Sequence, residues 1–248
     1  MAGDGLQIVG RIRSCFPENF GVPRQAGLVP TAIAELRFTR EFSRKELVRG
    51  LEQFSHVWLL FLFHQALAEG WQPTVRPPRL GGRRRLGVFA TRSPHRPNHL
   101  GLSLVRLLGI DQEGDQPVLI LGGVDLLDNT PVLDIKPYLS YADAVGDSHC
   151  GCFEQEDVPV VVTFSAVAGD FCRDYQLQTG RPLARLIEEV LAADPRPASQ
   201  RGRKKSFGMS LWDVNIRWQV DGNRFHVLSC TVTGTAGSPT LKGIQAPR

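Results

Sequence analysis

Short apolar runs typical of β-strands follow one another through the first part of the chain, and turn-forming residues rather than long helices separate them. LQIVGRIRS (residues 6–14) alternates apolar and polar residues as a half-buried strand does, and AELRF (34–38) repeats the pattern. HVWLLFLF (56–63) is continuously apolar, which predicts a strand buried on both faces. A doubly wound parallel sheet requires a helix between successive strands, so the sequence predicts a mainly β fold instead.

Two further segments complete this part. LSLVRLLGI (102–110) predicts a strand, and residues 117–139 predict a strand, a turn at Asp128 and Asn129, and a second strand. SRKELVRGLEQF (43–54) changes the period: Ser43 and Glu46 have capping-box spacing, which predicts a short amphipathic helix.

The C-terminal part has a different character and predicts a small α+β domain. VPVVVTFSA (158–166) reads as a strand, and RPLARLIEEVLAADP (181–195) has apolar residues at helical spacing until Asp194 and Pro195. A β-hairpin is expected around DGN (221–223). We therefore expect a first domain over residues 1–145, a connector over 146–157, the small domain over 158–232 and a disordered tail over 233–248.

Composition and charge set broad limits on function. The chain has 248 residues, 42% of them hydrophobic, and a formal net charge of +4, which permits a polyanionic partner without requiring one. The longest apolar run is too short to span a bilayer, and no secretory leader is recognisable. Five scattered cysteines do not form a disulfide framework. We therefore expect a cytoplasmic protein without a membrane segment.

No metal site is expected. His149, Cys150 and Cys152 could form half of one, but no second Cys/His pair stands at ligand spacing.

The loop within GVFATRSPHRPNHLGLSLVRL (87–107) carries more charge than a turn needs. Arg92 and Arg96, held by a backbone that prolines stiffen and followed by Asn98, could be directed at an anionic or planar ligand. A solvated basic turn is the alternative.

A basic cluster lies before the last hairpin, with Phe207, Trp212 and Trp218 nearby. This pattern is typical of nucleic-acid contact, although a solvated loop is the alternative, and the aromatic rings could either stack on a base or pack in the core. The cluster comprises Arg196, Arg201, Arg203, Lys204 and Lys205.

Seven motifs, taken together and in order, resemble the TrmO family, also called YaeB or VirR-like proteins. They are GVPRQAGLV (21–29), RGLEQFSHVWLLFLFHQ (49–65), TVRPPRLGG (74–82), GVFATRSPHRPN (87–98), GLSLVRL (101–107), DLLDNTPVLDIKPYL (125–139) and DPRPA (194–198). The resemblance implies an S-adenosylmethionine-dependent tRNA methyltransferase that acts on N6 of threonylcarbamoyladenosine beside the anticodon. It also implies a β-barrel-like donor domain, a small C-terminal domain and a homodimer.

The same resemblance implies which residues hold the methyl donor. They are Pro23, Arg24, Gln25, His64, Gln65, Arg92, Leu102, Gly122, Gly123, Val124 and Asp125. An arginine could pair with the donor carboxylate and Leu102 could cover the adenine. His64 could instead be a satisfied core histidine, and the two glycines a β-bulge. Arg96, Asn98 and the basic cluster are the candidates for tRNA contact, specifically with the anticodon stem-loop, and no general base is identified.

Two other classes of function remain open from the sequence. One is an S-adenosylmethionine-binding enzyme with a small-molecule substrate, and the other is a non-catalytic RNA-binding regulator. Neither explains both parts of the chain as economically as a tRNA methyltransferase. Methyl transfer from a sulfonium requires no Lewis acid, so no metal is expected in any of these readings.

Overall fold

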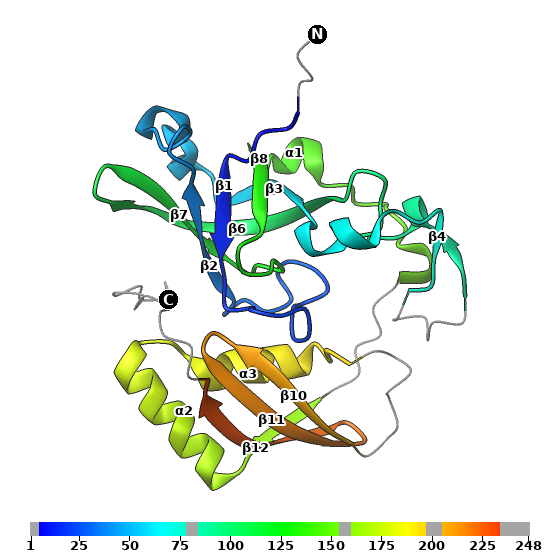
Figure 1. Cartoon of the computed structure of the whole chain (residues 1–248), viewed down its shortest axis with the longest axis vertical. Helices are drawn as coiled ribbons and strands as arrows, with labels where there is room; N and C mark the ends of the chain where they lie inside the picture. Colours follow the sequence, from blue (N-terminus) through cyan, green and yellow to red (C-terminus); the bar gives the residue numbers. More distant parts are fainter. Residues whose placement is uncertain (1–4, 78–83, 154–159, 197–204, 234–248) are drawn as a thin grey trace.

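A computed structural model describes residues 5–77, 84–153, 160–196 and 205–233, without the side chains of Cys152 and Lys205. Figure 1 shows two units, one above the other. The upper unit is a curled sheet formed by the first part of the sequence. The lower unit combines a second sheet with two helices.

Six strands form the curled sheet, and each pairs with its neighbours in the order β1-β2-β7-β6-β3-β8. The order returns to β1 because β8 also pairs with it, through Gly10 opposite Val132 and Arg11 opposite Pro131. This closing joint has only these two residue pairs, so the sheet is better described as strongly curled than as a regular barrel. The strands are β1 (Gly10–Arg13), β2 (Ile33–Phe38), β3 (His56–Leu62), β6 (Leu100–Glu113), β7 (Gln116–Gly122) and β8 (Pro131–Pro137).

The interior of the curled sheet is filled by alternate residues of its strands. Ile12, Leu36 and Leu59 are fully buried, while their chain neighbours face outward. The prediction that β3 is buried on both faces is wrong, because its residues alternate between buried and half-buried positions. Bulky apolar residues on the outer face of β3 are therefore only partly covered.

The predicted helix over residues 43–54 is also wrong. The segment forms two 3₁₀ turns, η1 (Lys45–Val48) and η2 (Leu51–Gln53), and Ser43 makes no capping hydrogen bond. Gly50 between them has φ of 86°, a left-handed conformation that interrupts a right-handed helix.

Several short elements connect the strands. They are η3 (His64–Glu69), β4 (Thr74–Val75), β5 (Leu86–Gly87), η5 (Val88–Ala90), α1 (Ser140–Asp143) and η6 (Gly151–Phe153). Strands β4 and β5 pair to form a separate two-stranded ribbon beside the curled sheet.

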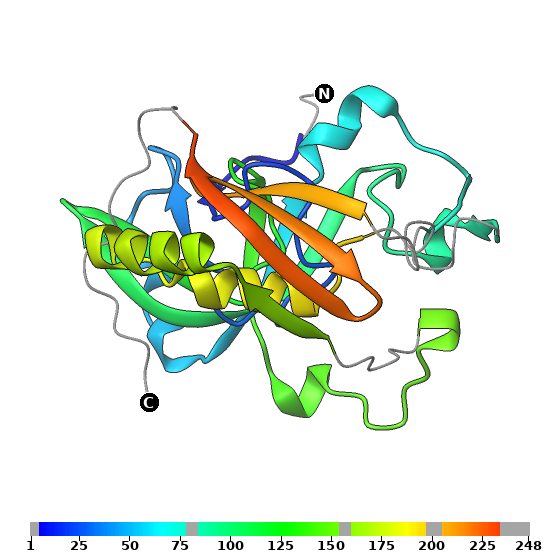
Figure 2. The same ribbon diagram turned by 90° about the horizontal axis from the view of Figure 1, so that it is seen from below.

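The lower unit is a four-stranded sheet in the order β10-β11-β12-β9, with β9 parallel to β12. Its strands are β9 (Val161–Phe164), β10 (Lys205–Leu211), β11 (Val214–Asp221) and β12 (Arg224–Val232). Helices α2 (Ala166–Thr179) and α3 (Leu183–Ala192) pack on each other and contact β9, and α2 also contacts β12 (Figure 2). The predicted final hairpin and α3 are present, whereas α2 and β10 were not predicted.

The connection between β1 and β2, residues 14–32, lies between the two units and bonds to both. Trp212 N donates to Cys15 O at 2.8 Å, and Ser210 N donates to a Glu18 carboxylate oxygen at 2.7 Å. Thr31 donates to Glu189 of α3 through its backbone N and its hydroxyl, both at 2.7 Å. One continuous cluster of buried side chains runs through both units, so the units share a core.

The predicted architecture, a mainly β first domain followed by a small α+β domain, is confirmed, and the sheet of the first domain is curled rather than a regular closed barrel. The domain limits stay predictions, and the tail from residue 234 and residues 154–157 of the connector lie outside the described residues. None of the helices in the described part of the chain is long and apolar enough to cross a membrane.

Gly101 of β6 offers a test of the packing inside the curled sheet. A Cβ at this position would lie 2.2 Å from the buried Phe61 ring on β3, so we expect Gly101→Ala to destabilise the fold by about 1–3 kcal/mol. Thermal unfolding of the two proteins would measure the effect. Gly109→Ala, on the same strand with nothing within 4 Å of the added Cβ, is the matched control. Equal losses of stability in the two variants would show that the Phe61 ring does not require a glycine at position 101.

Candidate functional site

The structure brings several of the predicted donor-binding residues together at one end of the curled sheet. Residues 23–27 of the β1–β2 connection lie against the residues that follow β7, because Gly27 N donates to Gly123 O at 2.7 Å. From the loop before β6, Arg92 donates a hydrogen bond to the side-chain oxygen of Gln25. Three segments far apart in sequence therefore meet here.

Asp125 is the most unusual group at this meeting point. Its side chain is largely enclosed, and its Oδ1 atom has no hydrogen-bond partner among the described residues. Burial raises the pKa of Asp125 above its ordinary value. Hydrogen bonds from Ser103 and from backbone groups, and the positive charge of Arg92, oppose that rise. A buried, unpartnered carboxylate oxygen is costly, and such groups are concentrated at functional sites.

The two glycines after β7 are explained by backbone geometry. Gly123 has φ of 69°, and a Cβ there would lie 3.2 Å from the Gly27 backbone. A Cβ at Gly122 would lie 3.1 Å from the Leu108 side chain. The β-bulge considered from the sequence occurs instead on β6, between Leu107 and Gly109. Val124 is buried beside these glycines, and its N donates to Ala32 O at 3.2 Å.

His64 and Gln65 begin the η3 turn directly after β3. Burial lowers the pKa of His64, the charge of Arg11 lowers it further, and a hydrogen bond to the Leu62 backbone opposes both effects. The imidazole is therefore favoured in its neutral form. Gln65 is exposed, and its side-chain oxygen accepts from Asn19 Nδ2 at 2.9 Å.

Leu102 and Pro23 differ in exposure. Leu102 on β6 is 58% exposed, which suits a side chain that covers a ligand, whereas Pro23 is buried in the β1–β2 connection.

Arg24 of the β1–β2 connection contacts the backbone of the lower unit, and its predicted role in donor binding stays a prediction. Its Nη2 atom donates to the backbone oxygens of Asp194 and Arg196, both at 2.8 Å. The guanidinium therefore ties the β1–β2 connection to the segment after α3. Of the two arginines considered as partners for a donor carboxylate, Arg92 has the better placement because its side chain is exposed beside Gln25.

The loop before β6 is held by its own side chains. Arg96 donates to Thr91 O at 2.8 Å, and its guanidinium lies 5.6 Å from the centroid of the Phe89 ring. His99 has a left-handed backbone with φ of 50°, and its Nδ1 lies 2.9 Å from Pro94 O. Asn98 is exposed between them, so this loop offers polar groups to solvent from a rigid frame.

The tRNA contact of Arg196 stays a prediction, and the placement of this side chain does not favour it. The side chain is only 4% exposed, its Nε lies 2.8 Å from Asp194 Oδ1, and the guanidinium covers the Phe225 ring at 4.7 Å. Arg201, Arg203 and Lys204 lie outside the described residues, and Lys205 is the first residue of β10.

The aromatic residues near the cluster mainly belong to the core. Trp218 is fully buried, with Phe207 stacked at 4.7 Å on the ring and Phe225 at 5.3 Å, so it cannot stack on a base. Trp212 is only partly buried and lines a surface pocket between the units.

Two features of the site were not anticipated. Ser103 lies beside Asp125, and Asn19 donates a hydrogen bond to the side-chain oxygen of Gln65. Ser103 lies within the GLSLVRL motif, which is the only sequence signal that could have identified it. Among the described residues, no group of three His, Cys, Asp or Glu side chains could hold a metal ion.

Comparison with known proteins agrees with this arrangement. Residues 11–144 match the profile of the tRNA-methyltransferase O N-terminal domain, and residues 157–233 match that of the TrmO C-terminal domain. The chain is 46% identical over 232 residues to the tRNA (adenine(37)-N6)-methyltransferase of Escherichia coli K12, which covers 92% of this chain and 98% of that protein.

Two comparisons with Pseudomonas aeruginosa proteins point the same way. A putative S-adenosylmethionine-dependent methyltransferase, RcsF, is 50% identical over 213 residues, 85% of this chain and 90% of that protein. The crystal structure of TrmO from that organism superposes with a TM-score of 0.77 at 42% identity, over 94% of this chain and 98% of that one. With both domain profiles matched in order and the fold shared along nearly its whole length, the chain belongs to the TrmO family.

Proposed function

We propose that this protein transfers a methyl group from S-adenosylmethionine to N6 of threonylcarbamoyladenosine at position 37 of tRNA, beside the anticodon. The observation that carries the proposal is the cluster of Gln25, Arg92 and Asp125, which stands at one end of the curled sheet. The relatives support the reaction class, since the Escherichia coli protein, which aligns over 98% of its length, is named as a tRNA (adenine(37)-N6)-methyltransferase.

The residues of the site fit the donor chemically. Asp125 Oδ1 is a buried hydrogen-bond acceptor that has no partner among the described residues. A hydroxyl or ammonium group of S-adenosylmethionine would satisfy it. Arg92 would pair with the donor carboxylate, and exposed Leu102 would cover the adenine. Pro23, Gln25, His64, Gln65, Gly122, Gly123 and Val124 would complete the walls. S-adenosylmethionine supplies a methyl group bonded to a positively charged sulfur.

The loop before β6 would position the acceptor nucleotide. Methyl transfer needs the acceptor nitrogen in line with the departing group, so a frame held by the Arg96–Thr91 and His99–Pro94 contacts contributes by orientation. The carbonyl attached to that nitrogen makes its proton more acidic, and a hydrogen-bond donor such as Asn98 near this carbonyl would stabilise the resulting charge.

The lower unit would contact the anticodon stem-loop through Arg201, Arg203, Lys204 and Lys205. We further propose a homodimer. In support of it, Leu67, Trp71 and Phe89 are 48%, 57% and 74% exposed on segments that adjoin the candidate site, and neighbouring exposed apolar side chains are typical of a protein interface. The segments are neighbours because Gln72 N donates to His95 O and Val88 N donates to Pro73 O.

The substrate assignment can be tested with labelled S-adenosylmethionine and two tRNA preparations, one carrying the threonylcarbamoyl group and one lacking it. We expect label only on the modified tRNA, at the nucleotide next to the anticodon. Label on both preparations, or on neither, would contradict the assignment. Transfer of label to a small molecule in the absence of tRNA would favour a different class of enzyme.

Substitutions of Arg92 and Arg24 should distinguish an effect on S-adenosylmethionine binding from an effect on the stability of the fold. Arg92→Ala removes an exposed cation beside Gln25, so we expect S-adenosylmethionine affinity to fall by about 1.5–3 kcal/mol with little change in Tm. Arg24→Ala removes the tie to Asp194 and Arg196, so Tm should fall. Calorimetry and thermal unfolding measure the two effects. Unchanged affinity in folded Arg92→Ala would exclude Arg92 from the donor site.

Asp125→Asn tests whether a buried carboxylate is kept for binding at the expense of stability. Because the folded-state pKa of Asp125 is raised, its contribution to stability is present at low pH and is lost as pH rises from its ordinary value of 3.8 through the raised value. We therefore expect the Tm of the variant relative to the parent to increase as the pH rises from 3.8 through the raised pKa of Asp125, while its affinity for S-adenosylmethionine falls.

The control for this variant is Asp134→Asn, which removes an exposed carboxylate on β8. A Tm difference that does not change with pH in Asp125→Asn would show that the carboxylate is not destabilised by burial.

A further inference from the structure

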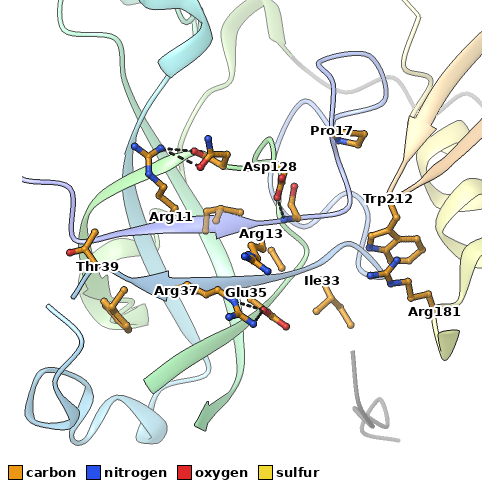
Figure 3. A pocket seen from close by; sticks show the side chains of 15 residues that line it. Arg11, Arg13, Pro17, Ile33, Glu35, Arg37, Thr39, Asp128, Arg181 and Trp212 are labelled. Carbon is orange, nitrogen blue, oxygen red and sulfur yellow. Dashed lines mark hydrogen bonds and ion pairs between the residues drawn. The ribbon is translucent and has the colours of Figure 1, made fainter. Parts of the chain in front are cut away.

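A concave surface of about 630 Å³ lies between the outer face of β1 and β2 and the turn that joins β10 to β11. We call it the interunit groove. Figure 3 shows Arg11, Arg13 and Arg37 along the two strands, with Trp212 and Arg181 of the lower unit at one end. None of these residues belongs to the predicted donor set, and four of the five are cations.

The arginines of β1 point outward because the strand alternates. Ile12 is fully buried in the curled sheet, so Arg11 and Arg13 on either side of it project from the opposite face and are exposed. Side chains two residues apart on one face of a strand are separated by about 6.6 Å. The two side chains therefore leave the same face of one rigid strand.

Most other charges in the interunit groove are already paired. Arg37 bonds Glu35 at 2.8 Å and also pairs with Glu113, and Arg181 lies 3.4 Å from an Asp213 carboxylate oxygen. Arg11 bonds only neutral oxygens of Asn129, at 3.1 Å and 3.4 Å. Within the described ranges, the Arg13 side chain makes no hydrogen bond or ion pair, although Glu35, which pairs with Arg37, lies opposite it on β2. Neither Arg11 nor Arg13 is therefore in an ion pair of its own.

The end of the interunit groove formed by Trp212 and Arg181 is held in place by contacts within the protein. Trp212 has a left-handed backbone with φ of 51° that is held by its bond to Cys15 O, and the Arg181 guanidinium lies 5.2 Å from its ring. Burial, together with a hydrogen bond to Asp213, raises the pKa of Tyr175 to about 12, so its hydroxyl stays protonated and donates to Asp213 at 2.5 Å. The same hydroxyl accepts from Arg181 at 3.0 Å.

The interunit groove also leads toward the candidate site. Arg11 is close enough to His64 for its charge to lower the pKa of that imidazole. Phe61 of β3 and Gly10 of β1 both lie opposite Val132 of β8, which places the end of β3 level with the β1 arginines. A chain-like ligand at the site could therefore continue past Arg11 and Arg13 to Trp212.

We propose that the interunit groove binds the sugar-phosphate backbone of tRNA next to the target nucleotide, with Arg11 and Arg13 contacting successive phosphates. This inference rests on the proposed function, because it takes tRNA to be the substrate. Two open guanidinium groups in a row suit an extended polyanion better than a single small anion, which would occupy only one of them. Such contacts set the position of the RNA and carry no sequence preference.

The experiment measures binding of an anticodon stem-loop RNA to the full chain at several salt concentrations. Each lost contact to a single strand should lower the slope of log affinity against log salt by about 0.7, so Arg13→Ala should lose about 0.7 and Arg11→Ala with Arg13→Ala about 1.4. Arg13→Glu should weaken binding further at low salt. In turnover, KM for tRNA should rise while kcat at saturating tRNA stays unchanged.

The matched control is Arg49→Ala, which removes an exposed arginine between η1 and η2, the turns that pack on β7 and β6. Equal salt slopes for the Arg11/Arg13 double variant and for Arg49→Ala, with Tm preserved in both, would overturn the proposal. Displacement of the RNA by inorganic phosphate at comparable concentration would also overturn it, in favour of a small-anion site.

Failure of the proposed function would look different. If the parent protein transfers no methyl group to modified tRNA but the double variant still loses RNA affinity and salt slope, the interunit groove stands and the reaction is misassigned. If the parent methylates modified tRNA and the double variant has the same salt slope as the parent, the reaction is correctly assigned and the RNA binds along another surface.

Discussion

The structure depends on one long connection, residues 14–32, that is held between two sheets. It contains neither helix nor strand, and its backbone bonds to both units: Gly27 bonds Gly123 of the upper unit, whereas Cys15 bonds Trp212 and Thr31 bonds Glu189 of the lower unit. The Arg24 side chain adds a bond to the Asp194 carbonyl after α3. Connections of this length without secondary structure are uncommon in compact domains and are usually functional. Here the same segment carries Gln25, so the placement of a candidate donor-binding side chain depends on how the lower unit is docked.

Sequence patterns predicted the elements whose burial follows a simple period. The alternation in β1 and β2 and the apolar spacing of α3 are direct consequences of one buried face, and each of these elements is present. The segment 43–54 also has helical spacing, but Gly50 takes a left-handed conformation that composition alone does not reveal. Helix α2 was missed because it is only weakly amphipathic, although Ser165 caps its start and Gly180 ends it.

The candidate site was predictable only through motifs, since its contacts join segments that local patterns cannot connect. Nothing around Asp125 in the sequence indicates that Ser103 lies beside it or that one carboxylate oxygen lacks a partner. The charge pattern around Arg196 also gave no indication that this side chain is buried. A run of cations in a sequence does not show which of them are buried. Arg196 pairs with Asp194 and covers the Phe225 ring only because the sheet and the end of α3 lie together in the fold.

The two surfaces of the molecule are linked through the same connection. Its first residues hold the Trp212 turn, which forms one wall of the interunit groove, and its later residues hold Gln25 beside Arg92. A shift of the lower unit would therefore displace the groove wall and strain the donor-side contact together, because a shared, closely packed core transmits such a shift rather than absorbing it. The arrangement makes the relative position of the two units part of the site, and the small unit contributes to it even though it supplies none of the predicted donor-binding residues.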